Sequence, residues 1–172
     1  MTFEEVYKKF GPMIRARCRY LLKNAEDSED LFQEICLLLQ RKLKDFLACE
    51  SQVGWIYRVT TNLALNAIRS RARRLKRGMP TEDLSDVQDP IDFETQIQSR
   101  IQSRAIILKI PDTLQPLFVH YYWDGMTQEE AAVVLRCSRI TVARQLAKLK
   151  ILLREEENSP NTSDGSQTNA EA

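Results

Sequence analysis

Residues 127–142, TQEEAAVVLRCSRITV, carry the sharpest local signal in the chain and decide how its second half folds. Thr127 and Glu130 have the spacing of a capping box, in which a threonine and a glutamate three residues later cap the start of a helix. We expect this helix to run through Leu135 and a longer helix to begin at Arg139 after a tight turn. Two helices joined by so short a turn form a helix-turn-helix.

The side chains of this motif also predict how its two helices pack. Ala132 is small enough to lie where the helices cross, and Ser138 can cap the second helix. The shared core is expected from the apolar residues at helical spacing, namely Leu135, Val142, Leu146 and Leu149. Arg136 occupies a turn position where many such motifs have glycine in the left-handed conformation, and an arginine that keeps this geometry costs about 1 kcal/mol.

The outward side of the second helix, which should extend to about residue 154, is polar and basic: Arg139, Thr141, Arg144, Lys148 and Lys150. Such a helix fits the major groove of DNA, where early positions read bases and later cations hold phosphates. A helix pair without a DNA function remains open on this pattern alone.

The first half of the chain has helical periodicity only. Apolar residues three and four apart predict a first helix over 3–21, with Pro12 expected to kink or restart it. A second helix should begin around Asp27 and carry Phe46 on its apolar face, and a third should run from about Gln52 into the seventies. No window alternates as strands do, so the fold class is all-α.

Charge divides the chain into four blocks. The net charges are +7 for residues 1–78, −5 for 79–103, +4 for 104–154 and −5 for 155–172. Together with the turn-forming residues after position 78, this pattern predicts two small helical domains joined by an acidic, flexible linker. The expected boundaries are a first domain at 1–78, the linker at 79–96, a domain with the helix-turn-helix at 97–155 and a disordered acidic tail at 156–172. The second domain should open with helices from about Phe93 to Leu108 and Thr113 to Trp123.

Two surfaces of the first half are candidates for binding. One side of the second helix carries Asp30, Gln33, Glu34, Leu37 and Arg41, and a leucine among carboxylates favours a partner surface over a solvated face. One side of the third helix carries Arg58, Asn62, Arg69 and Arg73. The C-terminal end of this third helix holds six cations in nine residues. Such a density of positive charge favours binding to a nucleic-acid backbone over a helix end that is only solvated. They are Arg69, Arg71, Arg73, Arg74, Lys76 and Arg77.

Composition excludes several classes of protein. The chain has 172 residues, 43% hydrophobic and 28% charged, which is typical of a soluble globular protein. Its apolar runs are far shorter than the ~20 residues that span a bilayer, and the start of the sequence has no signal-peptide pattern. We therefore expect a cytoplasmic protein.

The few residues suited to catalysis or metal binding form no pattern. The four cysteines, Cys18, Cys36, Cys49 and Cys137, include no Cys-x-x-Cys pair and are interpreted as buried free thiols rather than a redox or metal sensor. The only histidine, His120, lies in an apolar helix without a catalytic neighbour at usable spacing. We expect no catalytic group, no metal, no cofactor and no enzyme activity.

Three segments together resemble the bacterial RNA polymerase sigma factors, specifically the extracytoplasmic-function (ECF) branch that retains only regions 2 and 4. Residues 27–35 are similar to the Asp-Leu-x-Gln-Glu segment of that family, and residues 55–64 to its Trp-Leu-Tyr-Arg-Ile-Ala-x-Asn segment. Residues 125–142 are similar to region 4. The resemblance covers about residues 2–154.

The resemblance implies a role for each surface and a set of partners. The expected partners are the beta-prime clamp helices and beta flap of core RNA polymerase, promoter DNA and an anti-sigma factor, which could hold the protein at the inner membrane. The clamp helices would bind Asp30, Gln33, Glu34, Leu37 and Arg41. The minus-10 element, with one flipped base, would bind Phe46, Tyr57, Arg58, Asn62, Arg69 and Arg73. The minus-35 element would bind Arg139, Thr141, Ala143, Arg144, Ala147, Lys148 and Lys150.

Two other functions fit parts of the sequence. A stand-alone helix-turn-helix regulator would explain the second half of the chain. It would give no function to the side of the second helix that carries Asp30, Glu34 and Leu37. A decoy that only sequesters an anti-sigma factor would not need the six cations. The promoter sequence does not carry over from the family, because Ala143 stands where its members often have a basic residue.

Overall fold

The computed structural model describes residues 1–78 and 106–158, and within these ranges the chain is helical without strands. The all-α fold class is confirmed. Residues 1–78, the first module, contain α1 (Phe3–Leu21), α2 (Ala25–Arg41), α3 (Leu43–Leu47) and α4 (Gln52–Lys76). Residues 106–158, the second module, contain a helical turn at 106–109, α6 (Gln115–Phe118), the π-helix η1 (Val119–Trp123), α7 (Gln128–Leu135) and α8 (Arg139–Asn158).

Some of the predicted segments lie outside the residues that the structure describes. The acidic linker at 79–96 and the beginning of the helix expected from Phe93 lie outside the described residues. So does most of the acidic tail at 156–172. However, α8 continues to Asn158, so the first residues of the expected tail belong to a helix.

α1 is one continuous helix, and the restart expected at Pro12 does not occur. Thr2 caps its start, because the Glu5 amide donates to the Thr2 hydroxyl and the Thr2 amide donates to the Glu5 carboxylate. Pro12 is exposed, whereas Phe10 and Ile14 on either side of it are buried. Packing of these neighbours holds the helix together across the proline.

α2 differs from its prediction at both ends. It begins at Ala25 rather than near Asp27, because the Asn24 side chain accepts a hydrogen bond from the Asp27 amide at 3.0 Å and caps the helix. It ends at Arg41, and Phe46 lies on the separate short helix α3.

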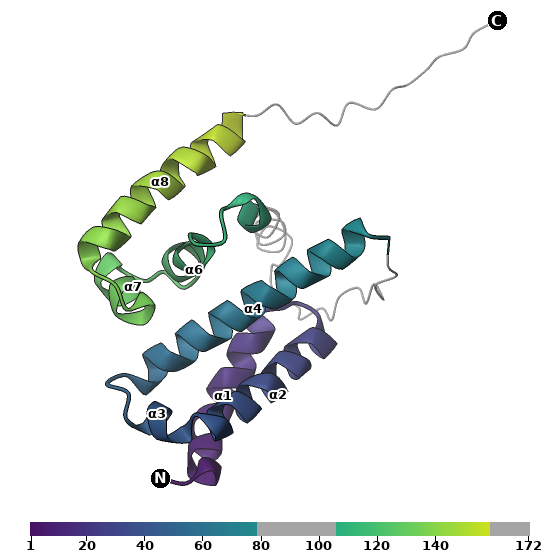
Figure 1. The fold of residues 1–172 in the computed structure, drawn as a ribbon, viewed down its shortest axis with the longest axis vertical. Helices are drawn as coiled ribbons and strands as arrows, with labels where there is room; N and C mark the ends of the chain where they lie inside the picture. Colours follow the sequence, from purple (N-terminus) through teal and green to yellow (C-terminus); the bar gives the residue numbers. More distant parts are fainter. Residues whose placement is uncertain (79–105, 159–172) are drawn as a thin grey trace, which may run out of the picture.

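α4 is the central element of the fold. Ser51 caps its start through a 3.0 Å hydrogen bond from the Gly54 amide. The helix packs against α1 and α2 on one side and against α6 and α7 on the other (Figure 1). The buried apolar side chains of the two modules therefore form one continuous cluster.

The helix expected over residues 113–123 is shorter and changes its geometry. After α6 the chain widens into η1, where the Asp124 amide donates to the Val119 carbonyl five residues earlier, at 2.9 Å. Gly125 then takes a left-handed φ of 66° and ends the helical segment. Wide π turns are rare in proteins and are frequent at functional positions.

The helix-turn-helix has the predicted form. Thr127 and Glu130 form the capping box of α7, and the Ser138 hydroxyl accepts from the Thr141 amide at 3.1 Å to cap α8. Ala132 is buried between the helices, as are Val142, Leu146 and Leu149. Arg136 keeps the left-handed turn, with φ 54° and ψ 46°.

Candidate nucleic-acid and partner interfaces

The predicted partner surface of α2 is an exposed stripe. All five members of this α2 stripe, Asp30, Gln33, Glu34, Leu37 and Arg41, are exposed. Leu37 is 58% exposed, whereas Ile35 and Leu39 beside it are fully buried in the core. An apolar side chain held in solvent between polar neighbours has the character of an interface anchor.

The α4 residues that are predicted to bind the minus-10 element are partly exposed and partly covered. Asn62 and Arg73 are exposed, whereas Tyr57, Arg58 and Arg69 are half-buried. Tyr57 lies under the Arg17 guanidinium of α1, and Arg58 shares a pocket with Arg136. Arg69 forms an ion pair with Asp112 of the second module, at 2.9 Å.

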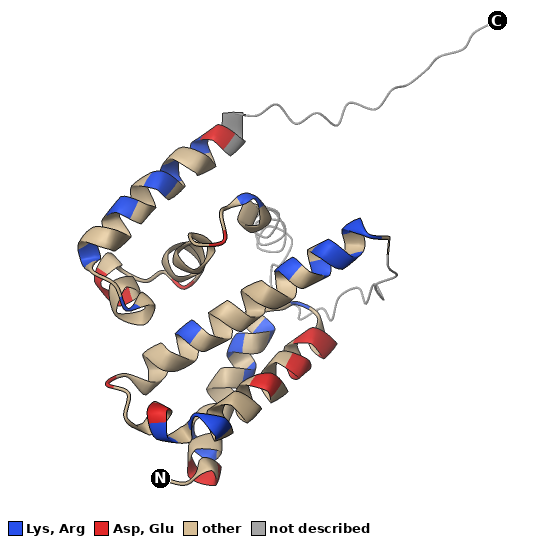
Figure 2. Ribbon diagram, viewed as in Figure 1, with Lys and Arg blue, Asp and Glu red and all other residues tan. Residues whose placement is uncertain are grey.

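The C-terminal end of α4 concentrates positive charge (Figure 2). Arg73, Arg74, Lys76 and Arg77 are all exposed there. Arg71 is instead partly neutralised, because it forms a 2.8 Å ion pair with Asp27 at the start of α2. The end of α4 therefore combines four exposed cations with Arg71, which binds α4 to α2, and Arg69, which binds it to the second module.

Phe46 does not lie where the sequence prediction put it. Its side chain is fully buried and makes edge-to-face contacts with Phe10 and Trp55, with ring centroids 5.6 and 5.2 Å apart. A side chain without exposed surface cannot line a pocket for a DNA base. In this conformation Phe46 supports Trp55 from the core.

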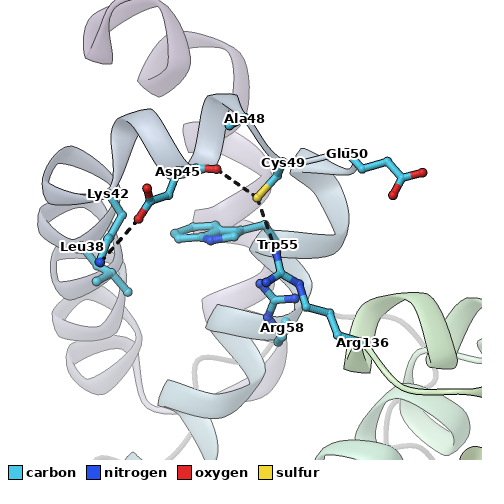
Figure 3. Close-up of a pocket in the computed structure, with 9 residues that line it drawn as sticks. All are labelled: Leu38, Lys42, Asp45, Ala48, Cys49, Glu50, Trp55, Arg58 and Arg136. Atoms are coloured by element: carbon cyan, nitrogen blue, oxygen red, sulfur yellow. Dashed lines mark hydrogen bonds and ion pairs between the residues drawn. The ribbon is translucent and has the colours of Figure 1, made fainter.

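A pocket of about 640 Å³ opens at the start of α4, beside Trp55 and Arg58 (Figure 3). Arg136 reaches into it from the turn of the helix-turn-helix, and its guanidinium lies 3.7 Å from the Cys49 sulfur. Burial and the positive charge of Arg136 lower the pKa of Arg58. The left-handed turn thus directs the arginine of one module to a pocket of the other.

The predicted DNA-reading side of α8 is open to solvent except at Thr141. Exposed members are Arg139, Ala143, Arg144, Ala147, Lys148 and Lys150. Thr141 is half-buried, and its hydroxyl lies 2.9 Å from the Ser138 hydroxyl. Arg139 forms an exposed 2.6 Å ion pair with Glu129 of α7.

A buried polar cluster between the modules was missed from the sequence. Arg17 of α1 donates two hydrogen bonds to the Asp124 carboxylate, at 3.0 and 2.8 Å, and a third to Thr61 of α4 at 2.8 Å. His120 Nδ1 lies 2.8 Å from the same carboxylate. The side chains of Arg17 and Asp124 are only 6% and 4% exposed.

The electrostatics of this cluster follow from its contacts. Burial alone would raise the pKa of Asp124, but its hydrogen bonds with His120 and Arg17 hold that pKa below its ordinary value. The carboxylate is therefore charged at neutral pH. One sequence signal pointed to the cluster: Arg17 stands at helical spacing from Phe10, Ile14 and Leu21, which places a charge on an apolar face.

All four cysteines are free thiols, and burial separates Cys18 from the others. Burial, with a smaller contribution from Cys36, raises the pKa of Cys18 to about 12. We therefore expect Cys18 to react with iodoacetamide at pH 8 about 100-fold more slowly than the half-buried Cys49, because only the thiolate is nucleophilic. Labelling of each cysteine, followed by peptide mass spectrometry, measures these rates. In urea the two rates should converge, and rapid labelling of Cys18 in the folded protein would contradict its burial.

Within residues 1–78 and 106–158, no group of three His, Cys, Asp or Glu side chains is arranged to hold a metal ion. In the same ranges, no helix has the length and apolar character required to span a bilayer.

Comparison with known proteins identifies the first module. The family model for sigma-70 region 2 matches residues 6–74, which contain the α2 stripe and nearly all of α4. Residues 6–74 are therefore a sigma-70 region 2. ECF sigma factors are among its relatives, which agrees with the resemblance seen in the three sequence segments.

Proteins similar to this chain extend over both modules. The ECF sigma factor SigE of Mycolicibacterium smegmatis is 24% identical over 157 residues, 90% of this chain but only 61% of its own length. RNA polymerase sigma-H factor of Pseudomonas aeruginosa is 25% identical over 172 residues, covering 90% of this chain and 89% of its own. The ECF sigma factor SigW of Bacillus subtilis is 23% identical, covering 90% and 88%.

A solved structure shares the fold. The sigma factor RpoE of Bartonella quintana, crystallised in complex with the anti-sigma factor NepR, aligns with a TM-score of 0.53 at 16% identity. The alignment covers 92% of this chain and 98% of RpoE.

Proposed function

We propose that this chain is an alternative sigma factor that binds core RNA polymerase and directs it to promoters. The observation that carries the proposal is the α2 stripe, which is exposed within the matched region 2. Its partner would be the beta-prime clamp helices of the polymerase, with Leu37 as the apolar anchor and Asp30 and Glu34 supplying charge. The second module would add a contact to the beta flap.

The minus-10 element would bind along α4. Asn62 is exposed and offers a donor and an acceptor to a base edge, and Tyr57 can stack on a base that has left the duplex. Arg58, Arg69 and Arg73 would hold the phosphates of the same strand. Capture of an unstacked base favours open over closed DNA through differential binding, so this subunit needs no catalytic step.

The minus-35 element would bind α8. Arg139, Thr141, Ala143 and Arg144 stand in the first half of the helix, where side chains of such motifs reach base edges. Ala147 leaves room for close approach, and Lys148 and Lys150 would contact phosphates. Affinity should therefore fall steeply as salt is raised.

Further properties follow from the relatives. The factor would act in the cytoplasm without enzyme activity and without a metal or cofactor. An anti-sigma factor would be its regulator, as NepR is crystallised with RpoE. Such a partner could hold the factor at the inner membrane. The domain boundaries proposed from the sequence, 1–78 and 97–155, would correspond to regions 2 and 4.

In vitro transcription with core polymerase and a library of upstream sequences tests the proposal. We expect selection of a defined start site, and we expect Asn62→Ala to reduce open-complex formation about tenfold while holoenzyme assembly is unchanged, because one base contact is worth about 1–3 kcal/mol. Permanganate footprinting measures opening, and gel filtration measures assembly.

Two outcomes would count against the proposal. No start-site selection from any sequence would reject the sigma function, and tight binding to duplex DNA without polymerase would favour a stand-alone regulator. Equal losses of opening and assembly in Asn62→Ala would reject the assigned role of Asn62.

A further inference from the structure

The outer side of α8 carries apolar side chains between its cations. The inner side is marked by three buried residues, Val142, Leu146 and Leu149. Successive residues of a helix are rotated by about 100°, which identifies the positions farthest from these three. All four of those positions are exposed: Ile140, Arg144, Ala147 and Ile151. Three of the four have no polar group in the side chain.

Ile140 is the most exposed apolar residue of this outer side. It is 78% exposed, compared with 58% for Ile151. Ile140 is the second residue of α8, and the first residues of such a helix are the ones that contact base edges in helix-turn-helix proteins. Its direction is fixed, because the Thr141 amide donates to the Ser138 hydroxyl at 3.1 Å and holds the start of the helix in place.

The polar side chains on either side of Ile140 are already engaged. Arg139 Nε lies 2.6 Å from a carboxylate oxygen of Glu129 on α7. Thr141 is half-buried, and its hydroxyl lies 2.9 Å from the Ser138 hydroxyl. Ile140 therefore offers the largest open surface in the first turn of α8, and that surface is apolar.

The charge around this surface indicates what covers it. Between Arg139 and Arg154, α8 carries five cations and no carboxylate (Figure 2). An apolar groove of another protein would have to accept these cations together with Ile140, and their desolvation is costly. DNA pairs the cations with phosphates and presents base edges between its two backbones. Charge complementarity therefore favours DNA as the occupant.

The major groove of DNA offers one apolar group to such a side chain. Adenine, guanine and cytosine present only donors and acceptors there, whereas thymine also presents its 5-methyl group. Ile140 has neither a donor nor an acceptor in its side chain, so it can favour one base pair over another only through that methyl group. Contact would remove both apolar surfaces from water.

We propose that Ile140 is a specificity-determining residue, which recognises a thymine of the minus-35 element by contact with the 5-methyl group. The inference rests on the proposed function of α8 and adds the base that its most exposed apolar side chain prefers. The minus-35 element then contains a thymine, on one strand or the other, opposite the first turn of α8. Recognition at this position depends on the methyl group and not on the hydrogen-bonding edge of the base.

The test compares thymine with deoxyuridine, which lacks only the 5-methyl group. Holoenzyme made from the full chain and core polymerase first selects upstream elements from a random library. Each thymine of the selected element, on either strand, is then replaced in turn by deoxyuridine. We expect one of these replacements to weaken binding about fourfold in a competition assay, which is the effect of one buried methyl group.

Ile140→Ala separates the proposed contact from other effects of the base. On the thymine duplex it should weaken binding about fivefold, whereas on the deoxyuridine duplex the change should stay below about twofold, because the methyl group is already absent. Ile151→Ala is the matched control, since it makes the same change on the same side about 17 Å further along the helix. It should keep the fourfold difference between the two duplexes. Both isoleucines are exposed, and circular dichroism at 222 nm verifies that the variants fold.

Each result decides a separate point. A selected element without thymine on either strand, or one in which no deoxyuridine replacement weakens binding, would overturn the proposal. Equal losses of Ile140→Ala on the two duplexes would also overturn it, because the side chain would then act on something other than the methyl group. If the holoenzyme selects no start site, the sigma function is rejected, and the same comparison on duplexes enriched by the full chain alone still decides the contact.

Discussion

Holoenzyme assembly should fall at least about 30-fold when Leu37 is replaced by Asp, because a central interface anchor contributes about 2 kcal/mol or more. The Leu37 side chain is 58% exposed in the free chain, so its replacement costs little folding stability. In the complex, however, the same side chain would be buried against the clamp helices, where a carboxylate without a partner is unfavourable. Fluorescence titration of labelled core polymerase measures the loss.

A charge reversal at Glu34 extends this prediction. Glu34→Arg should also weaken assembly, by a smaller factor and with a change in salt dependence, since a charge at the edge of an interface acts mainly on encounter. Glu4→Arg, which reverses an exposed carboxylate on α1, is the control and should leave assembly unchanged. Neither stripe variant should reduce DNA binding by the free chain. Unaltered assembly in Leu37→Asp would remove the α2 stripe from the polymerase interface.

The largest effect on stability is expected at Phe46. Replacement by Ala should lower the free energy of unfolding by about 3–5 kcal/mol, the usual cost of removing a buried phenylalanine. Phe46 is fully buried and contacts Phe10 and Trp55 in edge-to-face geometry, so both the burial and the ring contacts are lost. Urea denaturation followed by circular dichroism measures the change.

Phe3→Ala is the matched control for this measurement. Phe3 is half-buried at the first position of α1, and its replacement should cost well under half as much. Similar losses in the two variants would mean that Phe46 is less central than its burial indicates. A loss in Phe46→Ala below about 1 kcal/mol would indicate an accessible side chain, as the sequence-based prediction that Phe46 binds DNA requires.

Two surfaces of the first module differ in how far the sequence could predict them. Periodicity identified the α2 stripe completely, because a helix with one apolar face has only one other face to offer a partner. For the residues of α4, periodicity showed only which ones share a side of the helix and not which of them are exposed. Tyr57 lies under Arg17 of α1, and Arg69 pairs with Asp112 of the second module. No spacing within α4 contains that information.

Local interactions were sufficient to predict the helix-turn-helix from the sequence. The Thr127–Glu130 capping box and the Ser138 cap are interactions between residues three apart, so sequence alone predicted them correctly. It failed at the start of α2, where Asn24 took the cap, and at Phe46, whose helix separates from α2. At the start of α2 the deciding interaction is itself local, because the Asp27 amide donates to the Asn24 side chain, and the sequence prediction overlooked it. At Phe46 the side chain packs against Phe10 and Trp55, which only the tertiary structure shows.

The sequence by itself determined the all-α class, the order of the helices, the exposed α2 stripe and the cations at the end of α4. These depend on contacts between residues three or four positions apart. Only the tertiary structure decided that Arg17 is bound by Asp124, that Arg136 enters the pocket beside Arg58 and that α4 lies between the two modules. Such pairs are distant in the chain, and their contact depends on how whole helices pack, which local propensity does not specify.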